Sequence, residues 1–177
     1  MQQPYVMVIA GPNGSGKSTL VQTLRDVLPN NVAYVDPDAF VSTTSKASYA
    51  VAQIRAGRAA LQCMDDLIRR RVSIVIESTL SGKTLALRLA EAARLEYTIH
   101  IVLLQLQSVE TTVARVRNRV EQGGHDIAHN DQLRRFDRCY ANFASVYVDV
   151  CHTWSIYNAE HKPPRRMATG RGSLTAR

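Results

Sequence analysis

The sequence lacks most of the features that mark secreted, membrane-embedded or disordered proteins. It has only three cysteines, Cys63, Cys139 and Cys151, which are far apart and form no CxxC pair, so we expect reduced thiols and neither disulfides nor a metal site. No apolar run approaches the roughly 18 residues that a membrane-spanning helix needs. The first four residues have neither the basic start nor the apolar core of a signal peptide, which predicts a cytoplasmic protein.

What is present fits one compact domain. Hydrophobic residues make up 45% of the chain and charged residues 21%, a composition that excludes disorder and allows a sizeable core. The formal net charge of +7 is unevenly distributed, because residues 161–177 contain five basic residues and no acid. We therefore predict one domain over residues 1–160 and a basic flexible tail over 161–177. Since the domain itself is nearly neutral, we do not expect a nucleic-acid partner.

Short apolar segments alternate with amphipathic ones along the predicted domain. We expect strands near 5–10, 32–35, 72–76, 98–106 and 153–157, and helices near 18–28, 45–70, 85–95, 109–122 and 131–147. Near-continuous apolar strands separated by helices are typical of a parallel sheet that is covered on both faces. The sequence therefore predicts a three-layer α/β domain with a parallel five-stranded sheet, whose ligands bind at the carboxyl ends of the strands.

A phosphate-binding motif follows the first predicted strand. The segment Gly11-Pro12-Asn13-Gly14-Ser15-Gly16-Lys17-Ser18-Thr19 fits the pattern GxxxxGK[ST]. Glycines let consecutive backbone N–H groups surround a phosphate, and the helix N-terminus adds the positive end of its dipole. In this pattern the lysine meets the β- and γ-phosphate oxygens and the serine hydroxyl ligates Mg²⁺. We expect residues 11–19 to bind ATP or GTP, with Ser18 as the metal ligand; no [NT]KxD element indicates a guanine-specific switch.

Two aspartates stand at the end of the second predicted strand. Asp36 and Asp38 flank a proline that holds the backbone extended, so both carboxylates can reach the carboxyl edge of the sheet. A kinase needs an acid that orients and deprotonates the acceptor hydroxyl, and we assign this role to Asp38. The structural alternative is that Asp38 caps a helix beginning near Ala39. We expect Asp36 to contact the substrate as well, with a purely structural role as the alternative.

A third acid follows the third predicted strand, in the segment Glu77-Ser78-Thr79-Leu80-Ser81-Gly82. A carboxylate buried close to a phosphate loop is suitably placed to act on Mg²⁺ through water or on an acceptor hydroxyl. We therefore predict that Glu77 is catalytic and that Glu77 and Thr79 contact the substrate. The alternative is that Glu77 anchors the following loop through hydrogen bonds.

Arginines cluster in the region of the predicted fourth and fifth helices: Arg115, Arg117, Arg119, Arg134 and Arg135. Small-molecule kinases close a lid whose arginines neutralise charge on the transferring phosphoryl group. We expect one or two of these side chains to do this, with Arg119 as the first candidate. The alternative is a solvated helix face. His125 follows Gly123-Gly124, a typical helix stop, and we predict that it contacts substrate.

The segments GPNGSGKST, DPD, ESTLSG and RVRNRVEQGGHDI follow one another in an order and spacing that resembles the zeta toxin family of P-loop kinases, especially its short bacterial members. The resemblance covers about residues 4–158. It implies a kinase that uses ATP or GTP with Mg²⁺, phosphorylates a UDP-activated amino sugar such as UDP-N-acetylglucosamine, and is blocked by a cognate antitoxin. By the matching motifs, Lys17 and Ser18 serve nucleotide and metal, Asp38 resembles the catalytic base and Glu77 the second acidic residue. Short members tend to have an Asp-Asn pair near the nucleotide base, and this chain has Tyr157-Asn158 there instead. From the shared asparagine we expect Asn158 to contact the base.

The sequence differs from the family in two respects, and it allows two other functions. The chain is shorter than the well-known toxins, and its Gly-Gly-His region stands in place of a longer lid. One alternative function is a P-loop kinase for another hydroxyl, on a polynucleotide, a nucleoside or an antibiotic. The other is a nucleotide-dependent module whose basic tail binds nucleic acid, which predicts salt-dependent binding that is lost when residues 161–177 are deleted.

Overall fold

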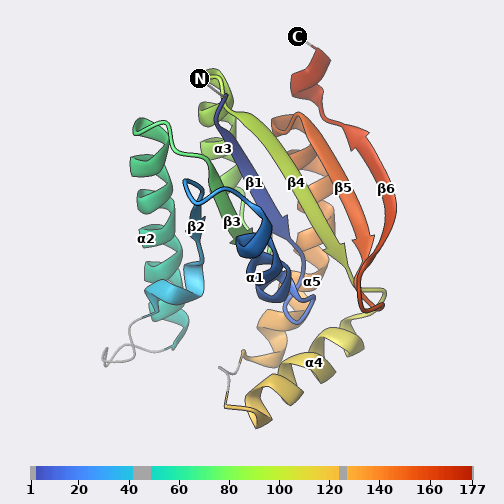
Figure 1. Cartoon of the computed structure of the whole chain (residues 1–177). Helices are drawn as coiled ribbons and strands as arrows, with labels where there is room; N and C mark the ends of the chain where they lie inside the picture. The colour runs from blue at the N-terminus through green and yellow to red at the C-terminus, as the bar shows by residue number, and fades with distance from the viewer. Residues whose placement is uncertain (1–2, 42–48, 124–126, 177) are drawn as a thin grey trace.

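Figure 1 shows the computed structural model of the chain, which describes residues 3–41, 49–123 and 127–176. Its centre is a six-stranded sheet with the order β2-β3-β1-β4-β5-β6. Five strands are parallel: β1 (Tyr5–Ala10), β2 (Ala33–Val35), β3 (Ile74–Ser78), β4 (Thr98–Gln105) and β5 (Thr153–Asn158). Because β1 lies between β3 and β4, the loop that follows β1 emerges at the middle of the sheet's carboxyl edge.

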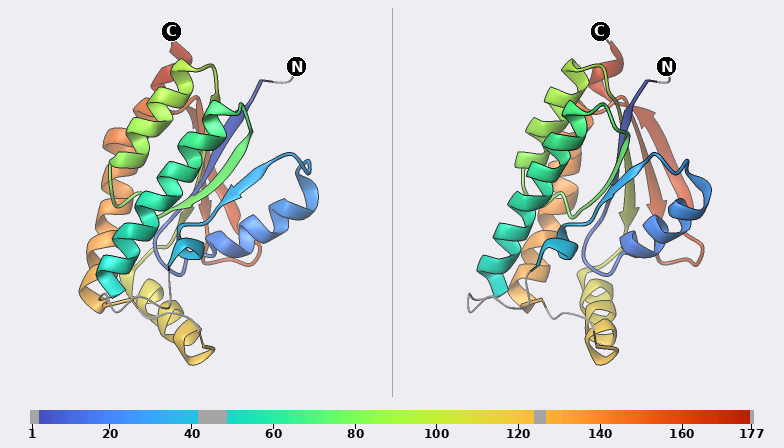
Figure 2. Two further views of the ribbon diagram at one scale, coloured as in Figure 1. Left: turned by 90° about the vertical axis from the view of Figure 1, so that its left-hand side faces the viewer. Right: turned by 60° about the vertical axis from the view of Figure 1, so that its left-hand side comes forward.

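Helices cover both faces of this sheet. One face packs against α2 (Tyr49–Arg69), α3 (Thr84–Arg94) and α5 (His129–Asn142), and the other against α1 (Lys17–Val27), as Figure 2 shows. The remaining long helix, α4 (Val109–Glu121), lies beyond the carboxyl ends of the strands. This arrangement confirms the predicted three-layer α/β domain.

Neighbouring residues of the central strand belong to different cores. Val8 packs in the cluster that contains Met64 of α2 and Leu89 of α3, whereas Ile9 packs in the cluster that contains Val21 of α1. Successive side chains of a strand point to opposite faces, and both faces here are covered. The strand is therefore apolar at consecutive positions, which explains why the sequence shows continuous apolar runs instead of alternation.

The prediction of a flexible tail and of five strands was wrong at the C-terminal end. Residues 165–171 form β6 (Arg165–Arg171), which pairs antiparallel with β5, and a short 3₁₀ turn, η4 (Ser173–Ala176), follows. In β6 every residue is exposed except Gly170, which is half-buried. A Cβ at Gly170 would lie 2.4 Å from the Trp154 ring, so glycine lets the strand approach that indole. An edge strand without a buried side has no hydrophobic pattern, and it therefore resembled a solvated tail.

Two element boundaries also differ from the prediction. The third strand was expected to end at residue 76, but Glu77 and Ser78 continue it by pairing with Ile9 and Ala10 of β1. The helix expected over 131–147 is divided into α5, a π-helical turn η2 (Phe143–Tyr147) and a 3₁₀ turn η3 (Val148–Val150). Within the described ranges, no helix combines the length and the apolar character that crossing a membrane requires.

Candidate active site

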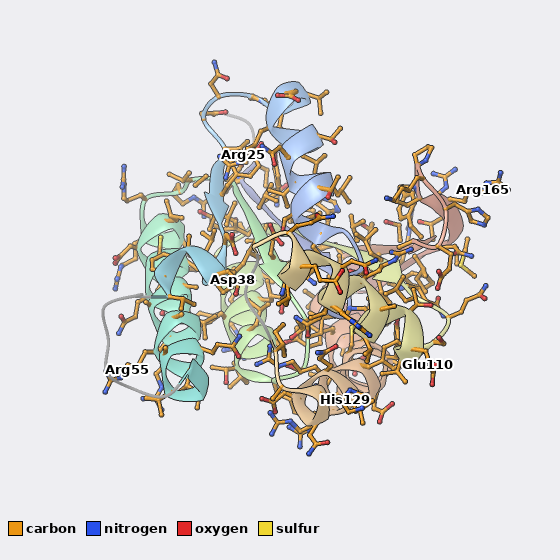
Figure 3. The ribbon with its side chains drawn as sticks, turned by 90° about the horizontal axis from the view of Figure 1, so that it is seen from below. Arg25, Asp38, Arg55, Glu110, His129 and Arg165 are labelled. Carbon is orange, nitrogen blue, oxygen red and sulfur yellow. The ribbon has the colours of Figure 1, made fainter. Side chains whose placement is uncertain are left out.

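A cleft of about 710 Å³ opens at the carboxyl ends of β1, β2 and β3. Figure 3 views the molecule from this side, with Asp38 on the short 3₁₀ helix η1 (Pro37–Phe40) beside α2. The predicted site residues that line the cleft are Asn13, Gly14, Gly16, Lys17, Ser18, Thr19, Asp36, Asp38, Glu77, Thr79 and Arg119. The fold thus brings together residues that are up to about a hundred positions apart in the sequence.

The phosphate loop has the backbone conformation that its glycines allow. Gly16 stands at the N-cap of α1 with φ 90°, and Gly14 has φ 74°. A Cβ at Gly14 would lie 2.9 Å from the Cβ of Arg115, so glycine also permits the close approach of α4. These positive φ angles are strained for other residues, which accounts for glycine at both positions.

The half-buried Lys17 side chain contacts the backbone of its own loop. Its Nζ donates hydrogen bonds to the carbonyl oxygens of Gly11 at 3.0 Å and of Pro12 at 2.9 Å. Burial lowers the pKa of Lys17, and the nearby Glu77 carboxylate offsets part of that effect. A cation held by two carbonyls and one nearby carboxylate is positioned to exchange those partners for phosphate oxygens.

Ser18 and Glu77 form a direct contact at the base of the cleft. The Ser18 Oγ donates to the Glu77 Oε2 at 2.8 Å, which joins the start of α1 to the end of β3. Burial raises the pKa of Glu77, and the hydrogen bond from Ser18 acts in the opposite direction. The carboxylates of Asp36 and Asp38 add a further increase in the pKa of Glu77. Both aspartates therefore lie close enough to Glu77 to act on it electrostatically.

These oxygen atoms fit a magnesium ion that is shared with a nucleotide. Within the described ranges no group of three or more His, Cys, Asp or Glu residues is arranged to hold a metal by itself. Mg²⁺ commonly binds through one or two protein oxygens together with substrate phosphates and water. The Ser18 hydroxyl and the Glu77 carboxylate, 2.8 Å apart, supply oxygen ligands of that kind.

The two aspartates after β2 have different local roles. The Asp36 side chain accepts a hydrogen bond from the backbone N–H of Asp38 at 2.9 Å and caps η1. The capping role considered for Asp38 therefore belongs to Asp36. Asp38 lines the cleft, and its charge acts on both Lys17 and Glu77.

The structure divides the five arginines into two groups. Arg115 and Arg119 on α4 and Arg135 on α5 line the cleft. The other two form exposed ion pairs within their own helices, Arg117 with Glu121 at 3.3 Å and Arg134 with Asp131 at 2.6 Å. The charge of Arg119 lowers the pKa of Lys17 further, so this arginine acts on the phosphate loop. Helical periodicity separates the two groups on α4, because residues four apart share a face.

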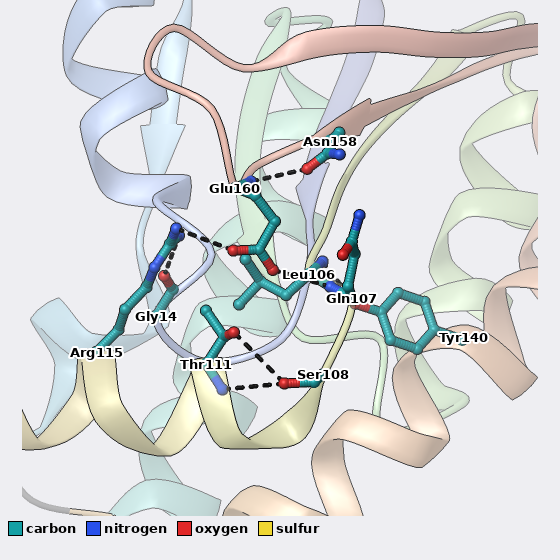
Figure 4. A network of polar contacts seen from close by, with 9 residues as sticks. All are labelled: Gly14, Leu106, Gln107, Ser108, Thr111, Arg115, Tyr140, Asn158 and Glu160. Atoms are coloured by element: carbon teal, nitrogen blue, oxygen red, sulfur yellow. Dashed lines mark hydrogen bonds and ion pairs between the residues drawn. The ribbon is translucent and has the colours of Figure 1, made fainter.

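Arg115 connects the phosphate loop to the C-terminal part of the sheet, as Figure 4 shows. Its guanidinium donates to the Gly14 carbonyl at 3.3 Å and pairs with the Glu160 carboxylate at 3.6 Å. The other oxygen of that carboxylate accepts the backbone N–H of Gln107 at 3.0 Å. The Asn158 Oδ1 accepts the Glu160 backbone N–H at 2.8 Å.

Four predicted site residues take other positions. Asn158 does not line the cleft, and its predicted contact with the base stays a prediction. Gly11 and Pro12 support Lys17 with their carbonyl groups, and Ser15 is buried at 2% exposure. The predicted substrate contact of His125 lies outside the described residues.

Several residues that line the cleft were not predicted from the sequence. They include Gln53, Ala56 and Gly57 on α2 and Lys162 in the turn between β5 and β6. The spacing of the three α2 residues, i, i+3 and i+4, marks one helix face, and their small or polar side chains distinguish it from the apolar core face. The Gln53 Oε1 accepts a hydrogen bond from Arg135 at 2.5 Å across the cleft.

The sheet, the phosphate loop and the cleft at the strand ends have the arrangement of the P-loop kinase fold. Within that class, the chain belongs to the zeta toxin family, whose model matches residues 1–161. An uncharacterized protein of Haemophilus influenzae is 31% identical over 130 residues, which are 73% of this chain and 91% of that protein.

Two solved structures illustrate the shared fold. A chain from the PezAT chromosomal toxin-antitoxin system of Streptococcus pneumoniae superposes with a TM-score of 0.71 at 14% identity, covering 99% of this chain and 77% of that chain. A chain from the Pnkp1/Rnl/Hen1 RNA repair complex has a TM-score of 0.65 at 21% identity, covering 82% of this chain. This protein spans 47% of that second chain, or about half of its length.

Proposed function

We propose that the protein is a kinase that transfers the γ-phosphoryl group of ATP or GTP to a hydroxyl of a UDP-activated amino sugar such as UDP-N-acetylglucosamine. We further propose that it is the toxin of a toxin–antitoxin pair. The observation that carries the kinase proposal is the cleft in which the phosphate loop, Glu77 and Asp38 meet. Membership of the zeta toxin family supports the acceptor and the antitoxin.

On the donor side, the residues of the loop bind the triphosphate. The N-terminus of α1 presents free backbone N–H groups and its dipole to the phosphates, and Lys17 moves its Nζ from the loop carbonyls to the phosphate oxygens. Ser18 and Glu77 would hold Mg²⁺, which neutralises negative charge on the phosphates when it is bound. Arg119 faces the same cleft and stabilises charge on the transferring group.

On the acceptor side, Asp38 is the proposed base. Its carboxylate takes the proton of the acceptor hydroxyl while the hydroxyl oxygen forms a bond to the γ-phosphorus. The bond between that phosphorus and the bridging oxygen breaks, and the nucleoside diphosphate leaves. Because Asp36 holds the Asp38 backbone N–H at 2.9 Å, the η1 turn keeps this carboxylate directed at the cleft.

The acceptor half of the cleft favours an acceptor that carries negative charge. Arg135 lines this half. Its guanidinium donates a hydrogen bond to the Gln53 Oε1 at 2.5 Å, which orients it. On the same helix as Gln53, Gly57 leaves room, because a Cβ there would meet nothing within 4 Å. The diphosphate of a UDP-sugar matches the paired donors of an arginine.

The test is transfer from γ-labelled ATP and GTP to a panel of acceptors, with the product hydroxyl located by mass spectrometry. We expect phosphorylated UDP-N-acetylglucosamine with the wild-type protein and none with Lys17→Ala. Neutral N-acetylglucosamine is the matched control for the diphosphate. Transfer to the neutral sugar at an equal rate would contradict the proposed acceptor, while the absence of transfer to every acceptor would contradict the kinase.

A second candidate acceptor is the end of a polynucleotide. The likeness to a chain of an RNA repair complex favours it, because that chain has the same fold at a TM-score of 0.65. A 5′-hydroxyl RNA also places a phosphodiester next to its hydroxyl, which suits Arg135. Including this RNA and its 5′-phosphorylated form in the panel separates the two acceptors, since the RNA kinase would label only the 5′-hydroxyl strand.

A further inference from the structure

We infer that the turn between β5 and β6, residues 159–164, completes the nucleotide site, and that Lys162 binds the phosphate chain of the donor nucleotide. The inference deepens the proposed function and rests on it for the identity of the donor as a nucleoside triphosphate. Lys162 lies just beyond residues 1–161, which the family model matches. Lys162 therefore lies outside the motifs from which the phosphate loop was predicted.

The position of Lys162 is the first observation. It lines the cleft together with Asn13, Gly14 and Thr19 of the phosphate-loop region. Among the described residues that line the cleft, it alone comes from the chain beyond α5. Figures 2 and 4 show the turn beside the N-terminal end of α1 and the loop. A side chain from this turn thus approaches the triphosphate from the wall opposite α2.

The anchoring of the turn is the second observation. At its start, the Ala159 backbone N–H donates to the Gln105 carbonyl at 2.8 Å. Glu160 is held by Gln107, by Asn158 and by Arg115, which itself contacts the Gly14 carbonyl. At its other end, β6 pairs with β5. The backbone around Lys162 is therefore fixed relative to the phosphate loop, while its side chain is exposed to the cleft.

The charge distribution is the third observation. Arg115 would be a natural phosphate ligand on this wall, but the Glu160 carboxylate lies 3.6 Å from its guanidinium and neutralises it. Lys162 forms no ion pair with a carboxylate among the residues that the structure describes. An unneutralised ammonium next to a phosphate loop attracts a polyanion and binds it as a point charge. On the side of the β5–β6 turn, Lys162 therefore supplies positive charge beside the phosphate loop that Arg115, paired with Glu160, does not.

The experiment measures nucleotide binding without any acceptor, by titrating a fluorescent, non-hydrolysable ATP analogue into Lys162→Met. We expect affinity to fall about three- to tenfold, as removal of one exposed charge does, and the dependence of affinity on salt to become less steep. Lys162→Arg should restore most of the affinity. The matched control is Arg166→Met, which removes the same charge from the same hairpin at an exposed position outside the cleft.

Three outcomes overturn the inference. One is an ATP affinity of Lys162→Met equal to wild type while Lys17→Ala has lost binding. Another is an equal loss in Arg166→Met, which would indicate a general effect of net charge. The third is an equal loss of adenosine affinity, since adenosine has no phosphate for Lys162 to bind. Failure of the proposed function looks different, because the Lys162 effect on ATP binding would persist while no acceptor is phosphorylated.

Discussion

The two halves of the cleft are built in different ways. In the donor half, short contacts connect the phosphate loop to α1, β3, α4 and the β5–β6 turn through Lys17, Ser18 and Arg115. In the acceptor half, Arg135 of α5 meets Gln53 of α2, and Gly57 leaves open space beside them. A triphosphate is the same in every donor, so its half can be rigid. Under the proposed function, the half with open space selects the acceptor, because function resides in the site and varies on a shared fold.

The largest effect should come from the donor half. Lys17→Ala removes the half-buried cation and leaves the Gly11 and Pro12 carbonyls without their hydrogen-bond donor. We expect nucleotide affinity and transfer both to fall, transfer by about 10² to 10³ as for other lost charge stabilisers. Titration with ATP and a transfer assay measure the two effects, and circular dichroism verifies that the fold is intact. Unchanged ATP affinity would contradict the role assigned to Lys17.

The next effect should separate the two halves. Asp38→Asn keeps the size of the side chain but cannot take a proton, so transfer should fall by about 10² to 10⁴ while ATP affinity stays within about twofold. Asp36→Asn is the matched control, because Asp36 caps η1 with its side chain and an asparagine oxygen can also cap. If Asp36→Asn lost as much transfer as Asp38→Asn, the base would be wrongly assigned.

Filling the acceptor half should act on the alcohol alone. A leucine at position 57 would project into space where a Cβ meets nothing within 4 Å, so Gly57→Leu should raise KM for the acceptor about tenfold or more. Gly57→Ala fills little of that space and should stabilise α2 by roughly 0.5–1 kcal/mol, as glycine-to-alanine changes in helix interiors do. Steady-state kinetics and thermal unfolding measure both. A raised KM for ATP would show that Gly57 belongs to the donor half.

The dependence on pH should follow the two buried charges. Burial lowers the pKa of Lys17, so as pH rises the cation is lost earlier than an ordinary lysine would lose it, and ATP affinity falls. Burial raises the pKa of Glu77, so as pH falls this carboxylate becomes protonated earlier than an ordinary glutamate, and transfer falls. The rate of transfer should therefore be high only over a narrow range of pH, with a loss at both the acid and the alkaline end. Lys17→Arg should remove the alkaline limb of binding, because arginine stays charged.

The two halves of the cleft also differ in how far their structure could be predicted from the sequence. The conformation of the phosphate loop could be predicted, because its positive φ angles require glycine at positions such as Gly14, whereas the phosphate contacts assigned to Lys17 and the other loop residues stay a prediction. The residues of the acceptor half could not be predicted, because a glycine and a glutamine on a long helix form no distinctive sequence pattern. The tertiary contact between Gln53 and Arg135 joins residues that are 82 positions apart, and only the folded chain brings these positions of α2 and α5 together.

The C-terminal strand was missed for a related reason. Prediction of a strand relies on a buried face with period two, and β6 has no buried face. Its stabilisation comes from backbone pairing with β5 and from Gly170 against Trp154, neither of which shows in composition. One consequence is practical: deleting residues 161–177 to test nucleic-acid binding would remove a strand, so Arg165 and Arg166 should be substituted instead.

The smallest effect should come from the contact that joins Arg115 to the β5–β6 turn. Glu160→Gln keeps an oxygen that can accept the Gln107 N–H, but it removes the negative charge that neutralises Arg115. The Arg115 and Glu160 side chains are 28% and 26% exposed. Stability should fall by less than about 1 kcal/mol, the usual value of a partly exposed ion pair. ATP affinity should rise by about two- to threefold, because a second cation then faces the phosphates.

The Glu160 variant also tests how the donor wall shares its charge. With Arg115 released from Glu160, a second cation stands beside Lys162 on that side of the cleft. Lys162→Met should therefore cost less affinity in the Glu160→Gln background than in the wild type. A double-mutant cycle on ATP binding measures this coupling. Strict additivity would mean that the two cations do not act on the same phosphates. Glu160 would then stabilise the structure of the donor half without changing how its cations bind ATP.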